Sequence, residues 1–189
     1  MIAMKNPKVL AILTFAGTAL AVTALDLWTK EAVFDLLEVQ SWGDPPRVGH
    51  QVEYTIIPGC FVLQANFNYG AFSGIFSKHT GWLAVLSAAA LVAICGIFWV
   101  QVRRHGNPGF PLTIALALLS AGTLGNLYDR LFLGAVRDWI KWFYVSGGRE
   151  HVWPNFNIAD SAICVGVGLL VLLEVRNILR ERKARKAAR

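Results

Sequence analysis

Charged residues are scarce in this sequence of 189 residues, and their scarcity argues against a soluble protein. Only 16% of the residues are Asp, Glu, Lys or Arg, whereas 55% are hydrophobic. A soluble domain usually has about 25% charged residues. The composition therefore indicates an integral membrane protein.

Motifs for metal, disulfide and nucleotide chemistry are also missing. The sequence has three cysteines but no CxxC pair, and four histidines but no HExxH motif. The segment "GNPG", residues 106 to 109, has no lysine at the position that a phosphate-binding loop requires. We therefore expect no metal and no other cofactor. We interpret Cys60, Cys95 and Cys164 as small core residues.

Long apolar runs are what the sequence has instead. A helix needs about 17 to 25 mostly apolar residues to cross a bilayer core of about 30 Å. Four runs fit, namely residues 9 to 25, 81 to 100, 110 to 128 and 158 to 175. We therefore predict an all-α bundle of four transmembrane helices, forming a single membrane domain from residue 1 to residue 189.

Basic residues near the ends of these runs set the predicted orientation. They precede the first run, separate the second from the third and follow the fourth, in segments that hold eleven of the eighteen Lys and Arg residues. Positively charged loops stay on the cytoplasmic side. We therefore expect both termini in the cytoplasm, including the basic tail from 176 to 189. Residues 26 to 80 and 129 to 157 would form loops on the outer face.

Two other interpretations of the basic residues have less support. A net charge of +6 could indicate nucleic-acid binding, but no stacking motif accompanies it, so anionic lipid headgroups are the preferred contact. Lys5 and Lys8 before an apolar run could also mark a cleavable signal peptide over the first 25 residues. The "DLWTK" that follows, residues 26 to 30, favours a permanent span.

The outer loops carry turn and interface signals. Six of the seven tryptophans fall near a predicted span end, as in the aromatic belts of membrane proteins. Residues 51 to 72 are rich in β-branched and aromatic residues, with Pro58 and Gly59 as a turn signal, and predict a hairpin or small extracytoplasmic β-sheet. Residues 136 to 145 mix tryptophan with charged residues, which predicts an interfacial amphipathic segment.

Four aspartates lie at the predicted outer face, at or just beyond the ends of three helices: Asp26, Asp129, Asp138 and Asp160. Charge at bilayer depth is costly, so acidic residues facing the bundle indicate a functional site. Helical spacing puts Asp129 on one face with Asn126 and Arg130, and Asp160 three positions after Asn157. Small residues at 122, 125, 162 and 166 would let the third and fourth helices approach closely.

Carboxylates gathered in one place have a definite chemistry. Two that share a site cannot both ionise cheaply, so one keeps its proton at neutral pH. The ionised carboxylate would take a proton from a water molecule that attacks a carbonyl, and the neutral one would donate to the developing oxyanion. This is the chemistry of an aspartic peptidase.

Each aspartate also has a purely structural interpretation. Asn157 and Asp160 could form an ordinary helix start. Asp129 with Arg130, and Asp26 with Lys30, could be simple ion pairs. Asp138 could keep an amphipathic segment at the membrane surface. The position of all four aspartates on one side of the membrane favours a shared site instead.

Five motifs occur in order along the chain: "DLWTK" from Asp26, "NYGAFSGIF" from Asn68, "GNLYDR" from Gly125, "VRDWI" from Val136 and "FNIAD" from Phe156. This series resembles that of the bacterial lipoprotein signal peptidase (signal peptidase II) family. The resemblance implies a four-helix aspartyl endopeptidase of the bacterial inner membrane, with its active site at the outer leaflet. Family members cleave the signal peptide of prolipoproteins on the amino side of a cysteine that already carries diacylglycerol.

The resemblance also implies roles for individual residues. By motif, Asp138 and Asp160 are the catalytic dyad. Supporting or substrate-binding roles fall to Asp26, Lys30, Asn68, Gly70, Asn126, Asp129, Arg130 and Asn157. The expected partners are a diacylglyceryl-modified prolipoprotein and membrane lipids, without nucleic acid, and the expected state is a monomer.

The sequence departs from the family pattern in two respects. The family usually has NxGAAFG where this chain has "NYGAFSG", so Phe72 and Ser73 replace the usual Ala and Phe. This departure concerns the packing of the sheet edge beside the substrate and leaves the dyad intact. Residues 38 to 55 and 144 to 154 are also longer than the family pattern leads us to expect.

Rival functions predict other features. A proton- or cation-coupled transporter would need acids near mid-bilayer or on both sides and usually internal repeats, whereas the first three runs contain no acid in their apolar cores and no repeat is visible. A lipid-binding scaffold would tolerate loss of either aspartate. A Ser/Lys dyad could use Lys30, but the outer serines Ser73, Ser77 and Ser146 have no motif around them.

Overall fold

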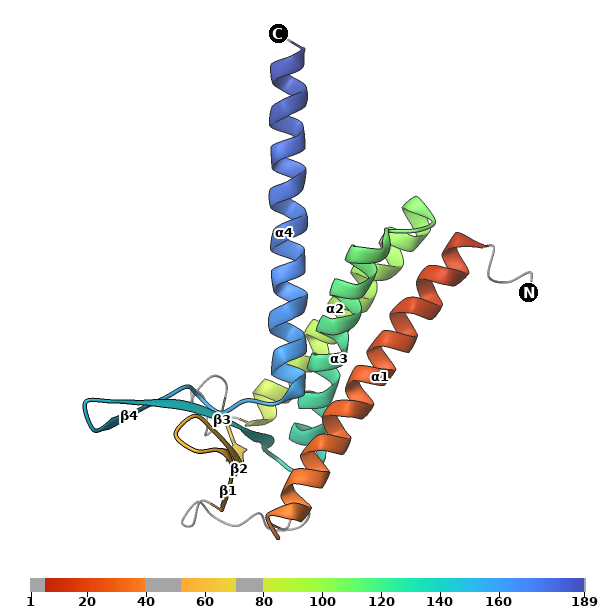
Figure 1. Ribbon diagram of the computed structural model, residues 1–189. Helices are drawn as coiled ribbons and strands as arrows, with labels where there is room; N and C mark the ends of the chain where they lie inside the picture. The colour runs from red at the N-terminus through yellow and green to blue at the C-terminus, as the bar shows by residue number, and fades with distance from the viewer. Residues whose placement is uncertain (1–5, 40–51, 71–79, 189) are drawn as a thin grey trace.

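Four long helices and a small antiparallel sheet make up the computed structural model, which describes residues 6–39, 52–70 and 80–188 (Figure 1). The helices are α1 (Pro7–Leu36), α2 (Thr80–His105), α3 (Phe110–Phe132) and α4 (Ile158–Ala187). All four are long and apolar enough to cross a membrane. The predicted fold class, a four-helix membrane bundle with a small β-sheet, is confirmed.

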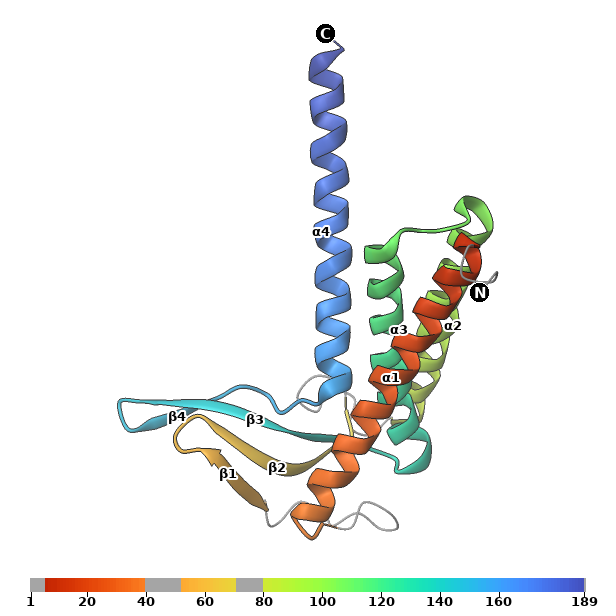
Figure 2. The ribbon, with the colours of Figure 1, turned by 45° about the vertical axis from the view of Figure 1, so that its right-hand side comes forward.

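Helix α3 is the centre of the bundle, because it packs against each of the other three helices. In the most apolar 18-residue stretch of α3, 56% is buried inside the protein, against 17% in the corresponding stretches of α1, α2 and α4. A Cβ added at Gly122 would collide with the backbone of Ala159, so the glycine permits the close approach of α3 and α4. The C-terminal half of α4 stands apart from the other helices (Figures 1 and 2).

The helix starts follow from local sequence. Asn6 accepts a hydrogen bond from the backbone N–H of Lys8, and Pro7 occupies the first position of α1. At α4, Asn157 and Asp160 form a reciprocal capping box, each side chain bonding the other's backbone N–H. The helix-start interpretation of these two residues is therefore correct, and it holds together with the further contacts described below.

The four strands are β1 (Glu53–Ile57), β2 (Phe61–Asn68), β3 (Val136–Ser146) and β4 (Arg149–Val152), paired in that order and antiparallel throughout. Gly59, with φ of 74°, lies in the turn between β1 and β2, as the sequence predicts. The expected amphipathic segment from 136 to 145 is strand β3, because its backbone groups find partners in β2 on one side and β4 on the other.

The sheet lies at the end of the bundle where α3 ends and α4 begins (Figures 1 and 2). A bulge shifts the β2–β3 register between Leu63 and Asn66, after which Asn66 faces Asp138 and Asn68 faces Val136. This register brings the end of β2 next to Asp138.

Several sequence-based expectations concern residues outside the described part of the chain. They include Lys5, the departures at Phe72 and Ser73, Ser77, and most of the long segment from 38 to 55.

Candidate active site

Five elements contribute polar groups to one cluster at the sheet end of the bundle. Helix α1 provides Asp26 and Lys30, β2 and the residues after it Asn68 and Gly70, α3 Asn126, Asp129 and Arg130, β3 Asp138, and the start of α4 Asn157 and Asp160. Hydrogen bonds and ion pairs connect all ten of these residues.

Lys30 is the buried cation of the cluster. Its Nζ lies 2.7 Å from Oδ2 of Asp26, 3.1 Å from Oδ2 of Asp129 and 3.1 Å from Oδ1 of Asn126. The Lys30, Asp26 and Asp129 side chains are fully buried. An ammonium group has three N–H donors, and one oxygen on α1 and two on α3 surround it. Lys30 therefore ties α1 to α3.

Asp129 has a second cationic partner, which is Arg137 and not its neighbour Arg130. Nη2 of Arg137 donates to Oδ1 of Asp129 at 2.9 Å, and the Arg137 backbone N–H donates to Oδ2 at 3.0 Å. Arg137 also pairs with Glu31 on α1. Because Asp129 is fully buried, the solvated pair with Arg130 considered from the sequence is not what the chain forms.

Asn126 links Lys30 to Asp160 through hydrogen bonds of its side-chain amide. Its Oδ1 accepts from Lys30, and its Nδ2 donates to Oδ1 of Asp160 at 2.7 Å. The accepted bond fixes which end of the amide faces the carboxylate, because an ammonium can only donate. Asp26 also reaches α4, since its Oδ1 accepts from the backbone N–H of Ala159 at 2.8 Å.

Asn157 joins the two candidate catalytic aspartates. Its Nδ2 donates to Oδ1 of Asp138 at 2.8 Å, and its backbone N–H donates to Oδ2 of Asp160 at 3.2 Å. The same Nδ2 also lies 3.1 Å from Oδ1 of Asn126. One fully buried residue therefore orients both carboxyl groups.

Asn68 holds the other oxygen of Asp138. Its Nδ2 donates to Oδ2 of Asp138 at 3.0 Å, and its Oδ1 accepts from the backbone N–H of Gly70 in a local turn. Nη2 of Arg130 lies 3.4 Å from the carbonyl oxygen of Gly70. Arg130 thereby contacts the segment that follows β2, and its positive charge acts on both Asp138 and Asp160.

The two aspartates have different environments. Asp138 is 1% exposed, whereas Asp160 is partly exposed at the first turn of α4. Burial and, next, the charge of Asp160 raise the pKa of Asp138 to about 8, although hydrogen bonds from Asn68 and Asn157 favour its ionised form. The raised pKa favours the neutral form of Asp138 at pH 7.

The cluster is suited to acid–base chemistry on a carbonyl group. It combines a carboxyl group whose raised pKa favours the protonated form with a second, partly exposed carboxyl group that accepts hydrogen bonds from Asn126 and Asn157. Among the described residues, no group of three or more His, Cys, Asp and Glu side chains is placed to hold a metal ion. The chemistry available to these residues is activation of a water molecule by one carboxylate and proton donation by the other.

Sequence reasoning missed Arg137 and Glu31 as members of the cluster. Arg137 is 1% exposed and compensates the charge of the buried Asp129, so it stabilises the cluster without contacting the dyad carboxyl groups. Its only sequence signal is its place in "VRDWI", directly before Asp138. Glu31 follows Lys30 and carries no signal of its own.

Comparison with known proteins identifies relatives over most of the chain. A model of the family described as "Signal peptidase (SPase) II" matches residues 18–176. The lipoprotein signal peptidase of Teredinibacter turnerae is 40% identical over 172 residues, which are 89% of this chain and 90% of that protein. The lipoprotein signal peptidase of Azoarcus sp. is 35% identical, over 91% of this chain and 88% of that protein.

Solved structures are similar as well. A bacterial membrane enzyme determined by the in meso method at 2.3 Å resolution superposes with a TM-score of 0.69. It is 26% identical, and the match covers 87% of this chain and 89% of the other. A second bacterial membrane enzyme, determined by the same method at 1.9 Å, has a TM-score of 0.63 at 27% identity, over 85% of this chain and 91% of the other.

Proposed function

Because the chain belongs to the signal peptidase II family, we propose that the cluster around Asn157 is the site at which it removes signal peptides from prolipoproteins. The chain is a multi-pass membrane peptidase of this family. Asp138 and Asp160 are the catalytic dyad. The observation that carries this assignment is that Asn157 donates hydrogen bonds to both carboxyl groups, which places them around one point.

The two carboxyl groups have separate tasks in this proposal. Asp138 holds the proton at rest, because burial and the nearby charge of Asp160 raise its pKa to about 8. Asp160 is the ionised partner, supported by the hydrogen bonds from Asn126 and Asn157 and by the N-terminal end of α4. Asp160 takes a proton from water as the water attacks the scissile carbonyl. Asp138 donates its proton to the oxygen that becomes negative.

The remaining cluster residues are positioning residues. Lys30 and Arg137 compensate the buried Asp26 and Asp129 and fix α1, α3 and β3 relative to one another. Asn126 and Asn68 orient Asp160 and Asp138. Arg130 and the Gly70 backbone lie beside them and form the edge of the site that the substrate approaches.

The substrate preference follows from where the site lies. The dyad is at the junction of α4 and the sheet, that is, at the end of a membrane span. A prolipoprotein signal peptide is itself an apolar helix, and a diacylglyceryl group on the cysteine after the scissile bond would hold that bond at the membrane surface. Cleavage then takes place on the amino side of the modified cysteine.

The same proposal sets the orientation. The basic end of α4 and the basic last turn of α2 lie in the cytoplasm, so the sheet and the dyad lie at the outer face of the bacterial inner membrane. Membrane lipids surround the four spans, and one copy of the chain contains the whole cluster, so a monomer suffices for activity.

The test uses purified protein in lipid vesicles with a prolipoprotein in two forms, one carrying diacylglycerol on its cysteine and one without it. Release of signal peptide from the modified form alone, with a new amino terminus at the cysteine, is the expected result. Equal cleavage of both forms would contradict the lipid requirement. Absence of cleavage from both would contradict the assigned activity.

A further inference from the structure

The paired ends of β3 and β4, from Phe143 to Val152, form a hairpin that extends beyond the rest of the sheet, and none of its residues belongs to the dyad. Its two arms pair from Phe143 with Val152 to Ser146 with Arg149, and Gly147 and Gly148 form the turn with positive φ. The hairpin projects sideways from the base of α4, across the direction of the helices (Figures 1 and 2). It contains most of the segment from 144 to 154 that is longer than the family pattern leads us to expect.

One side of this hairpin is aromatic. Residues that pair directly across two antiparallel strands, and residues two apart on one strand, point to the same side. Tyr144 pairs with His151, and the two rings stack with centroids 4.7 Å apart. The backbone N–H of Trp153 donates to the carbonyl of Trp142 at 2.8 Å, which places these two opposite each other. We call Trp142, Tyr144, His151 and Trp153 the aromatic side.

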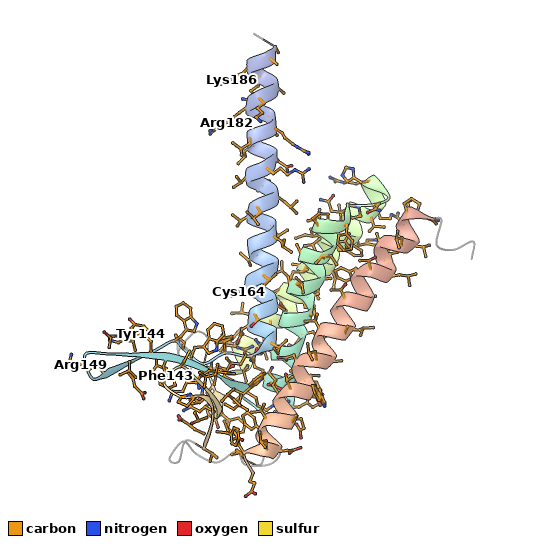
Figure 3. The ribbon with its side chains drawn as sticks, viewed as in Figure 1. Phe143, Tyr144, Arg149, Cys164, Arg182 and Lys186 are labelled. Atoms are coloured by element: carbon orange, nitrogen blue, oxygen red, sulfur yellow. The ribbon has the colours of Figure 1, made fainter. Side chains whose placement is uncertain are left out.

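The aromatic side faces the direction in which the helices run. Figure 3 shows Tyr144 on the side of the hairpin from which α4 rises, with Arg149 at the tip. Residues of the other parity, such as Val145 and Glu150, form a matched pair on the opposite side. The apolar spans therefore begin on the side to which Tyr144 points.

The rings of the aromatic side are uncovered. Trp142, Tyr144 and Trp153 are 54%, 61% and 63% exposed. Each buried Å² of apolar surface contributes about 25 cal/mol, so three open rings forgo a substantial stabilisation. Tyr and Trp, with an apolar ring and one polar group, are the side chains enriched where acyl chains meet headgroups.

We propose that the aromatic side of the β3–β4 hairpin rests on the lipid surface, with the three rings at the boundary between headgroups and acyl chains. Arg149 at the tip then reaches the phosphate groups. The outer edge of β4 limits the depth, because its backbone N–H and C=O groups need water or headgroups as partners and cannot enter the hydrocarbon. The inference rests on the proposed placement of the sheet at a membrane surface, and not on the catalytic assignment.

Site-specific labelling tests this contact. In a background with Cys60→Ser, Cys95→Ala and Cys164→Ala, a single cysteine is introduced as Tyr144→Cys or, for the opposite side, as Val145→Cys. Each variant carries an environment-sensitive fluorophore and is reconstituted in phosphatidylethanolamine and phosphatidylglycerol vesicles. Quenching is measured with a headgroup spin-labelled lipid and with iodide on both sides of the membrane.

We expect the label at 144 to be quenched several-fold more by the spin-labelled lipid than the label at 145, and the reverse order with iodide. Equal quenching of both labels by iodide, with no lipid effect, would overturn the inference. So would a lipid effect that disappears when the protein is diluted in lipid, because a second copy of the chain would then cover the rings. Prolipoprotein cleavage by the same labelled proteins reports separately on the proposed function.

Discussion

Asp138 and Asp160 are held by the same residue, since the side chain of Asn157 donates to Oδ1 of Asp138 at 2.8 Å and its backbone N–H donates to Oδ2 of Asp160 at 3.2 Å. One aspartate is on a strand and the other on a helix, so two separate elements must be kept in register. Asn157 does this while it also caps α4.

Replacement of Asn157 should therefore impair turnover more than binding. Asn157→Ala removes a hydrogen bond to a group that gains charge during the reaction, worth about 1.5 to 3 kcal/mol. Because about 1.4 kcal/mol corresponds to tenfold in rate, we expect kcat to fall by roughly 10- to 100-fold with little change in KM. Steady-state kinetics on the diacylglyceryl-modified substrate measure this split.

Asn6→Ala is the matched control, because Asn6 caps α1 far from the dyad. It should cost a similar helix-cap energy, about 1 kcal/mol, and leave kcat unchanged. If both variants lose kcat equally, the effect of Asn157 comes from helix stability and not from its contact with the dyad.

Cleavage should fall as the pH rises through about 8, because Asp138 then loses the proton it must donate.

Asn68 donates to the Asp138 carboxylate at 3.0 Å and so favours the ionised form. Asn68→Ala should raise the pKa of Asp138 further and move the alkaline limb of the pH–kcat profile to higher pH. Asn66→Ala, at the position opposite Asp138 on β2, is the control and should leave the limb in place. A limb that stays fixed or moves to lower pH in Asn68→Ala would contradict the role of Asp138 as the acid.

The same pKa has a consequence for stability. The folded state keeps a proton on Asp138 between the ordinary carboxyl pKa of 3.8 and about 8, whereas the unfolded chain has lost it. The contribution of this group to stability is therefore full below pH 3.8 and declines as the pH rises toward 8.

Loss of Lys30 should destabilise the fold strongly. Lys30→Met leaves Asp26 and Asp129 fully buried without their shared cation, which typically costs about 3 to 5 kcal/mol. Lys141→Met breaks the partly exposed pair with Glu53 and should cost about 1 kcal/mol or less. Thermal unfolding of both variants in detergent compares them directly. Similar unfolding temperatures would mean that Lys30 is not the cation that holds the cluster together.

A larger residue at Gly122, where α3 and α4 approach closely, should also destabilise the fold. In Gly122→Ala the new methyl group meets the Ala159 backbone, which cannot move aside as a flexible side chain would. We expect a loss of about 1 to 3 kcal/mol of stability together with reduced cleavage, because Asp160 shifts relative to Asn126. Gly168→Ala on α4 adds a methyl group in open space, and wild-type cleavage is expected there. Wild-type behaviour of Gly122→Ala would show that the contact is not tight.

The sequence predicts the large features of the fold well, because they follow from composition and spacing. Apolar runs locate the four helices, and Pro58 with Gly59 locates the β1–β2 turn. There are two exceptions. Cys60, Cys95 and Cys164, expected to be small core residues, are exposed in the structure. The other exception is strand β3. Its first half is buried on both sides of the strand, so the alternation of polar and apolar residues that marks a half-buried strand is missing.

The ion-pair partners within the site could not be predicted from the sequence. Helical spacing puts Asn126, Asp129 and Arg130 on one face of α3, but it cannot say which cation each carboxylate meets. Asp129 pairs with Lys30 and Arg137 because the β2–β3 register and the packing of α1 bring those side chains to it. Such partners are fixed only by tertiary structure.

The most direct test of the catalytic proposal is the rate of signal-peptide release by Asp138→Asn and Asp160→Asn in lipid vesicles, measured beside Asp35→Asn, which changes an exposed aspartate on α1. Asparagine keeps the size of the side chain and removes its acid–base function, so each dyad variant should lose at least about 10³-fold in rate while inserting and folding like the wild type. Asp35→Asn should cleave normally. Cleavage within tenfold of the wild-type rate by either dyad variant would contradict the account.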